Sequence, residues 1–172
     1  MGHFLMTKQE DRDTQVNIER ASARDVPRLV ELLGVLFSIE QDFVPDAERQ
    51  AAGLRLLLER EGGAIFVARD ARCVIVGMAT AQLVVSTAEG ALSAWIEDVV
   101  VDAALRRGGV GRALIAALLE WAEAAGATRA QLLVDTSNAA AEGFYGKLGW
   151  QTTQLAARRM TLRKKRAPGG AL

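Results

Sequence analysis

The sequence predicts an α/β fold of the α+β type, with a mixed, mostly antiparallel twisted sheet of about seven strands flanked by four helices. The expected order is β-α-α-β-β-β-α-β-α-β-β. Three observations support it. Strand-like apolar runs alternate with segments whose apolar residues recur at helical spacing. Three strand-like runs follow one another through short connections, which favours antiparallel hairpins. A strand, a helix and another strand then follow in the middle of the chain, the order of a crossover.

The first predicted elements are a strand and two helices. Val16–Ala21 has a strand-like composition, and Ser22 and Asp25 after it form an N-terminal helix signal. The apolar residues that follow share one helical face: Val26, Leu29, Val30, Leu33 and Phe37. Residues 47–60 are predicted as a second helix capped by Asp46. Its buried positions are expected at Leu54, Leu57 and Leu58.

Three strands and a third helix form the centre of the predicted fold. The strands are expected over residues 64–70, 74–85 and 91–101. After Gly111 the spacing becomes helical, with one stripe formed by Leu114, Leu118, Trp121 and Ala125. Gly126 is a natural C-terminal stop for this helix.

The last predicted elements are a strand over residues 129–135 and a short helix over residues 138–149, which ends at a glycine. Residues 150–153 and 157–162 are then expected to form a hairpin.

Length and composition indicate one domain over residues 16–162, with flexible tails over residues 1–15 and 163–172. The formal net charge is zero, so neither a basic field for nucleic acid nor a strongly acidic surface is expected. The sequence contains no signal-peptide core and no membrane-spanning stretch, which favours a cytoplasmic protein without membrane contact. Cys73 is the only cysteine and His3 the only histidine, so no metal site is expected.

The segment RRGGVGRALI, residues 106–115, places three glycines before the third helix. Leu114 stands where a dinucleotide fingerprint needs a small residue, and no Gly-Lys-Ser/Thr follows as in a Walker loop. One interpretation is a flexible connection into a helix. The other is an anion site, because glycines let backbone N–H groups converge at a helix N-terminus. Arg106, Arg107 and Arg112 add charge suited to phosphate oxygens.

Three segments in order match one known family. Residues 106–111 fit the signature Q/R-x-x-G-x-G/A, IEDVVVD before them looks like a central strand, and NAAAEGFYGKLGW looks like Asn-x-x-Ala-x-x-Phe-Tyr-x-Lys-x-Gly-aromatic. On these motifs, between Trp95 and Trp150, the sequence resembles the GNAT superfamily of acyl-CoA-dependent N-acetyltransferases. Ala103 and Leu105 depart from the commonest pattern, but neither supplies charge or a backbone donor to the phosphate loop.

The resemblance implies a site for acetyl-CoA as co-substrate, without a metal. In such proteins the central strand splays from its parallel neighbour and the pantetheine arm lies in the gap. The implied cofactor-binding residues are Val99, Val100, Val101, Arg106, Arg107, Gly108, Gly109, Val110, Gly111, Arg112 and Asn138. Packing in a buried strand is the structural alternative for the valines, and helix capping is the alternative for Asn138.

The resemblance also implies two catalytic residues. Glu97, near the splay, is the candidate base, directly or through water, with a salt bridge or a substrate anchor as alternatives. Tyr145 would approach the thioester sulfur as a general acid, unless it is a core ring. The backbone N–H of Val99 is a candidate donor to the oxyanion. Asp98 is expected on the opposite face by strand alternation, unless a bulge shifts the register.

The implied activity is acetyl transfer from acetyl-CoA to a primary amine of a small molecule or peptide, by direct attack in a ternary complex. Two alternatives remain open: a nucleotide-dependent oxidoreductase, which would bind NAD, and a non-catalytic acyl-CoA sensor or interaction module, which would bind without turnover. Homodimers are common among relatives, so a homodimer is also left open. A cationic acceptor is expected from four acids near the cleft mouth: Glu40, Asp42, Asp46 and Glu48.

Overall fold

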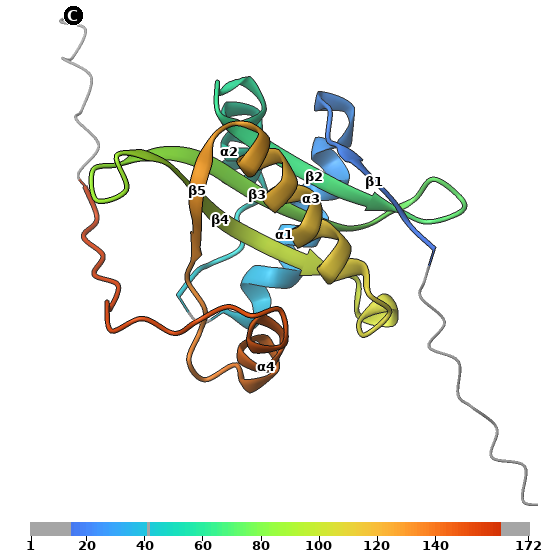
Figure 1. The fold of residues 1–172 in the computed structure, drawn as a ribbon. Coiled ribbons are helices and arrows are strands. Elements are labelled where there is room, and N and C mark those ends of the chain that lie inside the picture. Colours follow the sequence, from blue (N-terminus) through green and yellow to red (C-terminus); the bar gives the residue numbers. More distant parts are fainter. Residues whose placement is uncertain (1–14, 41, 163–172) are drawn as a thin grey trace, which may run out of the picture.

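The computed structural model describes residues 15–40 and 42–162, and its centre is one five-stranded sheet in the order β1-β2-β3-β4-β5 (Figure 1). Neighbouring strands are antiparallel from β1 to β4, whereas β4 and β5 run parallel. The strands are β1 Asn17–Arg20, β2 Gly63–Arg69, β3 Ile75–Ser86, β4 Ala91–Val101 and β5 Ala127–Leu132. The predicted fold class is confirmed.

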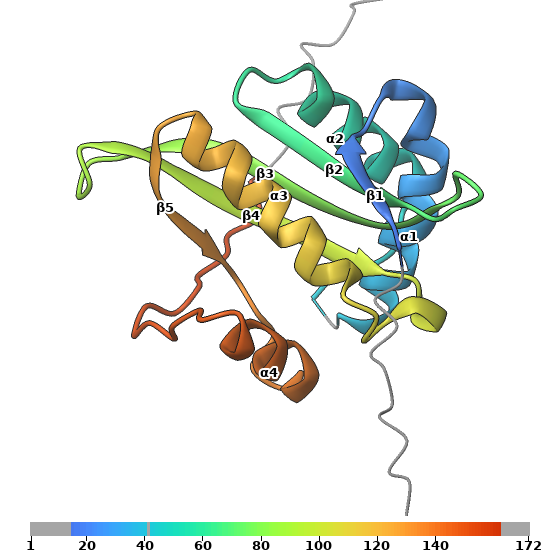
Figure 2. The same ribbon diagram turned by 45° about the vertical axis from the view of Figure 1, so that its right-hand side comes forward.

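Helices cover both faces of this sheet (Figures 1 and 2). The helices are α1 Val26–Ile39, α2 Ala47–Glu59, α3 Val110–Ala124 and α4 Ala139–Lys147. Alternation along β2 divides the core, because Ile65 and Val67 pack with α1 and α2, whereas Ala64 and Ala68 pack on the face of α3. α4 follows the end of β5 and lies beyond the sheet (Figure 2).

Side-chain caps fix the predicted starts of α2 and α4. Asp46 Oδ1 accepts a hydrogen bond from the backbone N–H of Arg49 at 3.1 Å. Asn138 Oδ1 accepts one from the N–H of Ala141 at 3.0 Å. Both residues therefore have the capping role that their sequence context predicts.

The end of the predicted fold is wrong. Residues 151–162 form neither strand nor helix, so the hairpin over residues 150–153 and 157–162 is absent and the sheet has five strands rather than about seven. Leu155 and Met160 are more than four-fifths exposed. A strand is stable only where its backbone groups find a partner, and an isolated hairpin is marginal in water. Strand-like composition alone does not provide that partner.

The tails predicted over residues 1–15 and 163–172 lie outside the described residues, apart from residue 15. Within residues 15–40 and 42–162, no helix is both long enough and apolar enough to cross a membrane.

Candidate active site

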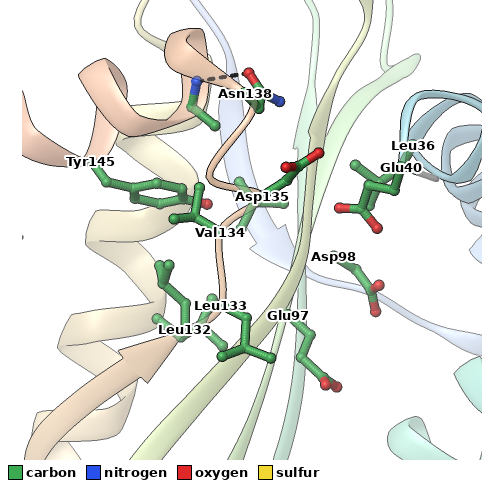
Figure 3. Close-up of a pocket in the computed structure, with 13 residues that line it drawn as sticks. Leu36, Glu40, Glu97, Asp98, Leu132, Leu133, Val134, Asp135, Asn138 and Tyr145 are labelled. Carbon is green, nitrogen blue, oxygen red and sulfur yellow. Dashed lines mark hydrogen bonds between the residues drawn. The ribbon is translucent and has the colours of Figure 1, made fainter. Parts of the chain in front are cut away.

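The parallel pairing of β4 with β5 stops halfway along β4. The last pair joins Ile96 to Leu132, and residues 97–101 have no partner on β5. The two strands part beyond this point, and a pocket of about 110 Å³ opens between their ends (Figure 3). The polar residues that line it come from α1, β4, α4 and the loop after β5: Glu40, Glu97, Asp98, Asp135, Asn138 and Tyr145.

A β-bulge in β4 turns two neighbouring carboxylates to the same side. Glu97 lies opposite Thr80, and the next pair joins Val100 to Met78. Between these pairs β4 has two residues and β3 only one, and Asp98 has a φ of 45°, in the left-handed region. Glu97 and Asp98 therefore both extend to the side of β4 on which Leu36 and Glu40 lie (Figure 3). Simple alternation would place Asp98 on the opposite face, but the exception left open for a bulge applies here, because the register shifts between Met78 and Thr80.

The Asp98 carboxylate lies against the buried hydroxyl of Thr80. Thr80 Oγ1 donates a hydrogen bond to Asp98 Oδ2 at 3.1 Å, and Thr80 is only 1% exposed. Burial raises the pKa of Asp98 to about 6, the Thr80 hydrogen bond opposes this shift, and the charges of Glu97 and Glu40 add to it. Asp98 therefore titrates much nearer to neutral pH than an ordinary aspartate.

Two further carboxylates reach the pocket from other elements. Burial raises the pKa of Glu40, and the charges of Asp135 and Asp42 raise it further. Asp135 Oδ1 accepts two hydrogen bonds from Ser137, one from its Oγ at 2.7 Å and one from the Ser137 backbone N–H at 2.8 Å. Both bonds lower the pKa of Asp135. The lining contains no lysine or arginine, and no ion pair within the described residues involves a carboxylate of the pocket. The pocket is therefore negatively charged.

Tyr145 enters from α4, on the side of β4 opposite to Glu40, Glu97 and Asp98 (Figure 3). Its ring contacts Phe144 and Trp150 edge-on, with centroid distances of 5.0 and 5.9 Å. Burial, and then the charge of Glu40, raises the pKa of Tyr145 to about 12. The phenol therefore keeps its proton at neutral pH and can act as a hydrogen-bond donor.

The glycine-rich loop lies at the N-terminus of α3. Arg107 has a φ of 66° and Gly109 a φ of 80°, so two left-handed residues curve the backbone just before the helix. Gly109 is the N-cap and supplies no side-chain hydrogen bond, which leaves the first N–H groups of α3 without a capping partner. Arg106 Nε donates to the carbonyl of Val101 at 3.1 Å, and the Arg107 and Arg112 side chains are exposed. This geometry fits a pyrophosphate.

Gly111 brings the loop into contact with the helix that carries Tyr145. A Cβ at position 111 would lie 3.2 Å from Cζ of Phe144 and 3.8 Å from Cγ2 of Val101. The absence of a side chain therefore lets the start of α3 pack against Phe144. The glycine-rich loop therefore packs against α4 next to Tyr145.

Comparison with known proteins identifies the family and the fold of this chain. Residues 27–150, from α1 to the aromatic residue after α4, match the model of the Acetyltransferase (GNAT) family. The chain belongs to the GNAT acetyltransferase family. No curated protein matches the chain.

Solved structures of acetyltransferases share the fold of this GNAT protein. An aminoglycoside acetyltransferase from an uncultured soil metagenomic sample, in complex with sisomicin, is 26% identical with a TM-score of 0.71, over 86% of this chain and 97% of that one. A Trypanosoma brucei acetyltransferase is 26% identical with a TM-score of 0.67, over 86% and 100% of the two chains. Glucosamine-6-phosphate N-acetyltransferase from Arabidopsis thaliana shares the fold at 19% identity, with a TM-score of 0.67 over 85% and 98%.

In this GNAT acetyltransferase the predicted site residues fall into two groups. Glu97, Val99, Asn138 and Tyr145 line the pocket, whereas the residues of the loop from 106 to 112 do not. The side chain of Val100 packs in the core beneath α1 and α2, and those of Val99 and Val101 pack on the side of α3. Neither Val100 nor Val101 lines the pocket, both pair with β3, and the Val101 carbonyl accepts the Arg106 hydrogen bond.

Sequence reasoning missed three polar residues of the site, Asp98, Asp135 and Thr80, of which Asp98 was misplaced by strand alternation. Thr80 lies in an apolar strand, and Asp135 follows β5 directly, so each has a weak signal in the sequence. Of the four acids expected at the cleft mouth, only Glu40 lines the pocket. Asp42 forms an ion pair with Arg159 at 2.9 Å, and Asp46 pairs with Arg49 at 2.9 Å while it caps α2.

Proposed function

We propose that this protein is an N-acetyltransferase that transfers the acetyl group of acetyl-CoA to a primary amine of a small molecule or peptide, by direct attack in a ternary complex. The observation that carries the proposal is the parting of β4 from β5 beyond Ile96, with Tyr145 on one side of β4 and Glu97 and Asp98 on the other (Figure 3). Membership of the GNAT family supports acyl transfer.

The free edge of β4 and the glycine-rich loop before α3 suit two parts of acetyl-CoA, the amide-containing arm and the pyrophosphate. The edge of β4 beyond Ile96 has no β5 partner, so its backbone groups are free to pair with an amide-containing arm. The first N–H groups of α3, with Arg106, Arg107 and Arg112 nearby, suit a pyrophosphate. Asn138 keeps its side-chain NH₂ for the ligand, because only its oxygen caps α4.

The chemistry requires one proton transfer from the amine and stabilisation of the departing sulfur. The amine nitrogen forms a bond to the thioester carbonyl carbon and loses a proton to a carboxylate of β4, while the carbonyl electrons move to oxygen. The electrons on oxygen then re-form the carbonyl as the C–S bond breaks, and the sulfur leaves with the electron pair of that bond. Tyr145 donates a hydrogen bond to that sulfur, and the backbone N–H of Val99 is the proposed donor to the oxyanion. The pKa of Tyr145, about 12, exceeds the ordinary thiol value of about 8.5, so the hydrogen bond rather than full proton transfer provides the help.

The acceptor is expected to be a cationic amine. Acids from α1, β4 and the loop after β5 converge on a pocket without a lysine or arginine, so an ammonium group there would find partners from several sides. The aminoglycoside acetyltransferase solved with sisomicin is a structural neighbour, and it supports this class of acceptor.

The test is release of free thiol from acetyl-CoA in the presence of diamines, aminoglycosides, amino sugars and peptides. Cys73 is exposed and adds at most one thiol per chain to the signal, so the assay is run beside a Cys73→Ser variant. Turnover is expected with cationic amines. Binding of acetyl-CoA without turnover of any amine would contradict the proposal and favour an acyl-CoA sensor.

Removal of the Glu40 charge should weaken acceptor binding. We expect Glu40→Gln to raise the KM of a diamine by about 3–10-fold at low salt, because a partly exposed ion pair contributes roughly 1 kcal/mol. The effect should be smaller for a monoamine and should shrink as salt increases.

Asp42→Asn is the matched control for this experiment. Asp42 is exposed, pairs with Arg159 and does not line the pocket, so its neutral variant should keep the KM of the diamine. Equal changes in the two variants would mean that Glu40 acts only through the general charge of the surface.

A further inference from the structure

We propose that Asp98, rather than Glu97, takes the proton of the attacking amine, and that Thr80 positions it for this step. The inference rests on the proposed function and assigns a residue within it. The geometry of the β4 bulge is its first support. Without the bulge, the Asp98 side chain would lie on the same face of the sheet as Ile96, the face that α3 covers. Because of the bulge, the carboxylate lies beside Glu97 on the side of α1 and lines the pocket.

The backbone at Asp98 is held in an unfavourable conformation. Asp98 has a φ of 45°, in the left-handed region, which a residue other than glycine usually keeps only where the surroundings impose it. Here β3 pairs on both sides of the bulge, and the buried hydroxyl of Thr80 is bonded to the Asp98 carboxylate. This left-handed backbone conformation places the Asp98 carboxylate in the pocket. Glu97 is exposed, and no hydrogen bond within the described residues fixes its side chain.

The surroundings of Asp98 suit a base that works near neutral pH. The charged and titratable groups that line the pocket with Asp98 are Glu97 on β4, Glu40 at the C-terminus of α1, Asp135 after β5 and Tyr145 on α4. Burial raises the pKa of Asp98 to about 6, and the charges of Glu97 and Glu40 contribute. A base is most effective when its pKa lies close to the working pH, so this carboxylate is better matched to an amine than an ordinary one.

The proton balance of the step is simple. As the nitrogen bonds to the carbonyl carbon, the Asp98 carboxylate accepts one N–H proton, directly or through one water. The C–S bond breaks, the sulfur leaves with its electron pair, and solvent protonates it. Asp98 then returns its proton to solvent through the open pocket, so the base is restored.

The decisive variant is Asp98→Asn. Asparagine tolerates the left-handed conformation, and its amide oxygen can still accept the Thr80 hydrogen bond, so only the basic group is removed. We expect kcat/KM to fall by about 10²–10³-fold and the acid limb of its pH profile, near pH 6, to disappear. Two acceptors with different amine pKa values separate this limb from ionisation of the substrate. Unchanged acetyl-CoA affinity and thermal unfolding show that the fold is intact.

Two other variants should move the acid limb in opposite directions. The ionised base is active, so activity falls as the pH drops through the pKa of Asp98. Thr80→Val removes a hydrogen bond that lowers the pKa of Asp98, so the limb should move to higher pH. Glu97→Gln removes a charge that raises the pKa of Asp98, so the limb should move to lower pH with a smaller loss of rate.

These outcomes decide the assignment even if Asp98→Asn fails to fold. Loss of the limb in Glu97→Gln, or retention of rate and limb in a folded Asp98→Asn protein, would make Glu97 the base and overturn the inference. A limb that stays in place in Thr80→Val would overturn the positioning role. A wild-type protein that acetylates no amine would overturn the proposed function itself, and this inference with it.

Discussion

Phenylalanine at position 145 should lower kcat by about 10–10²-fold and leave acetyl-CoA affinity nearly unchanged. Tyr145→Phe keeps the ring and removes only the hydroxyl that faces the opening between β4 and β5. The expected loss lies at or below the lower end of general acid–base effects, because the pKa of Tyr145 is raised to about 12 and its proton is held tightly. Single-turnover measurements, together with calorimetry of acetyl-CoA binding, would check both parts of this expectation.

A packing role for Tyr145 makes a different prediction. The ring contacts Trp150 edge-on at 5.9 Å, and Trp150 does not line the pocket. Trp150→Phe therefore loosens the packing of Tyr145 but leaves its hydroxyl in place. If that variant lost as much kcat as Tyr145→Phe, or if Tyr145→Phe turned over at the wild-type rate with chemistry rate-limiting, the hydroxyl would have no catalytic role.

Gly109→Val should raise the Kd of acetyl-CoA by about 100-fold, equivalent to about 2.7 kcal/mol. Gly109 has a φ of 80° and caps α3 without a side chain, so a β-branched residue strains the curve of the loop and stands beside the free N–H groups. Calorimetry gives the Kd directly. At saturating acetyl-CoA, kcat should change little, because the loop is remote from the reacting atoms.

Gly126→Val is the matched control for the loop. Gly126 has a φ of 87° at the opposite end of α3, and a Cβ there meets nothing within 4 Å. Both variants therefore place a strained valine at one end of the same helix, and both should lose thermal stability. Equal loss of affinity in the two proteins would mean that the loop acts through the stability of α3 rather than through contact with the ligand.

Most of the fold could be predicted because local signals agree with the packing. The side-chain oxygen of Asp46 caps α2, and Gly126 ends α3 with a positive φ, as their sequence contexts indicate. The strand over residues 91–101 has the predicted boundaries. The last hairpin could not be predicted correctly, because its formation depends on a partner for the sheet edge and not on the composition of residues 150–162.

The candidate site was predicted less completely than the fold. The loop motif and Tyr145 are local patterns, so sequence alone could single them out. The bulge at Asp98 depends on the register between β3 and β4, and the sequence encodes only the alternation that the bulge interrupts. The hydrogen bond from Thr80 joins residues 18 positions apart and exists only because that register brings them together.

The sheet is incomplete at the place where β5 leaves it, and this affects how its backbone exchanges hydrogen with solvent. Up to Ile96, β4 lies between two strands, and its amides are protected on both sides. Beyond Ile96, the amides that face the gap have no strand to protect them and should exchange deuterium rapidly in the free protein. A ligand that hydrogen-bonds along this edge would close the gap in place of a strand. The exchange rate of a few β4 amides would then report occupancy of the site directly, whether or not the occupant reacts.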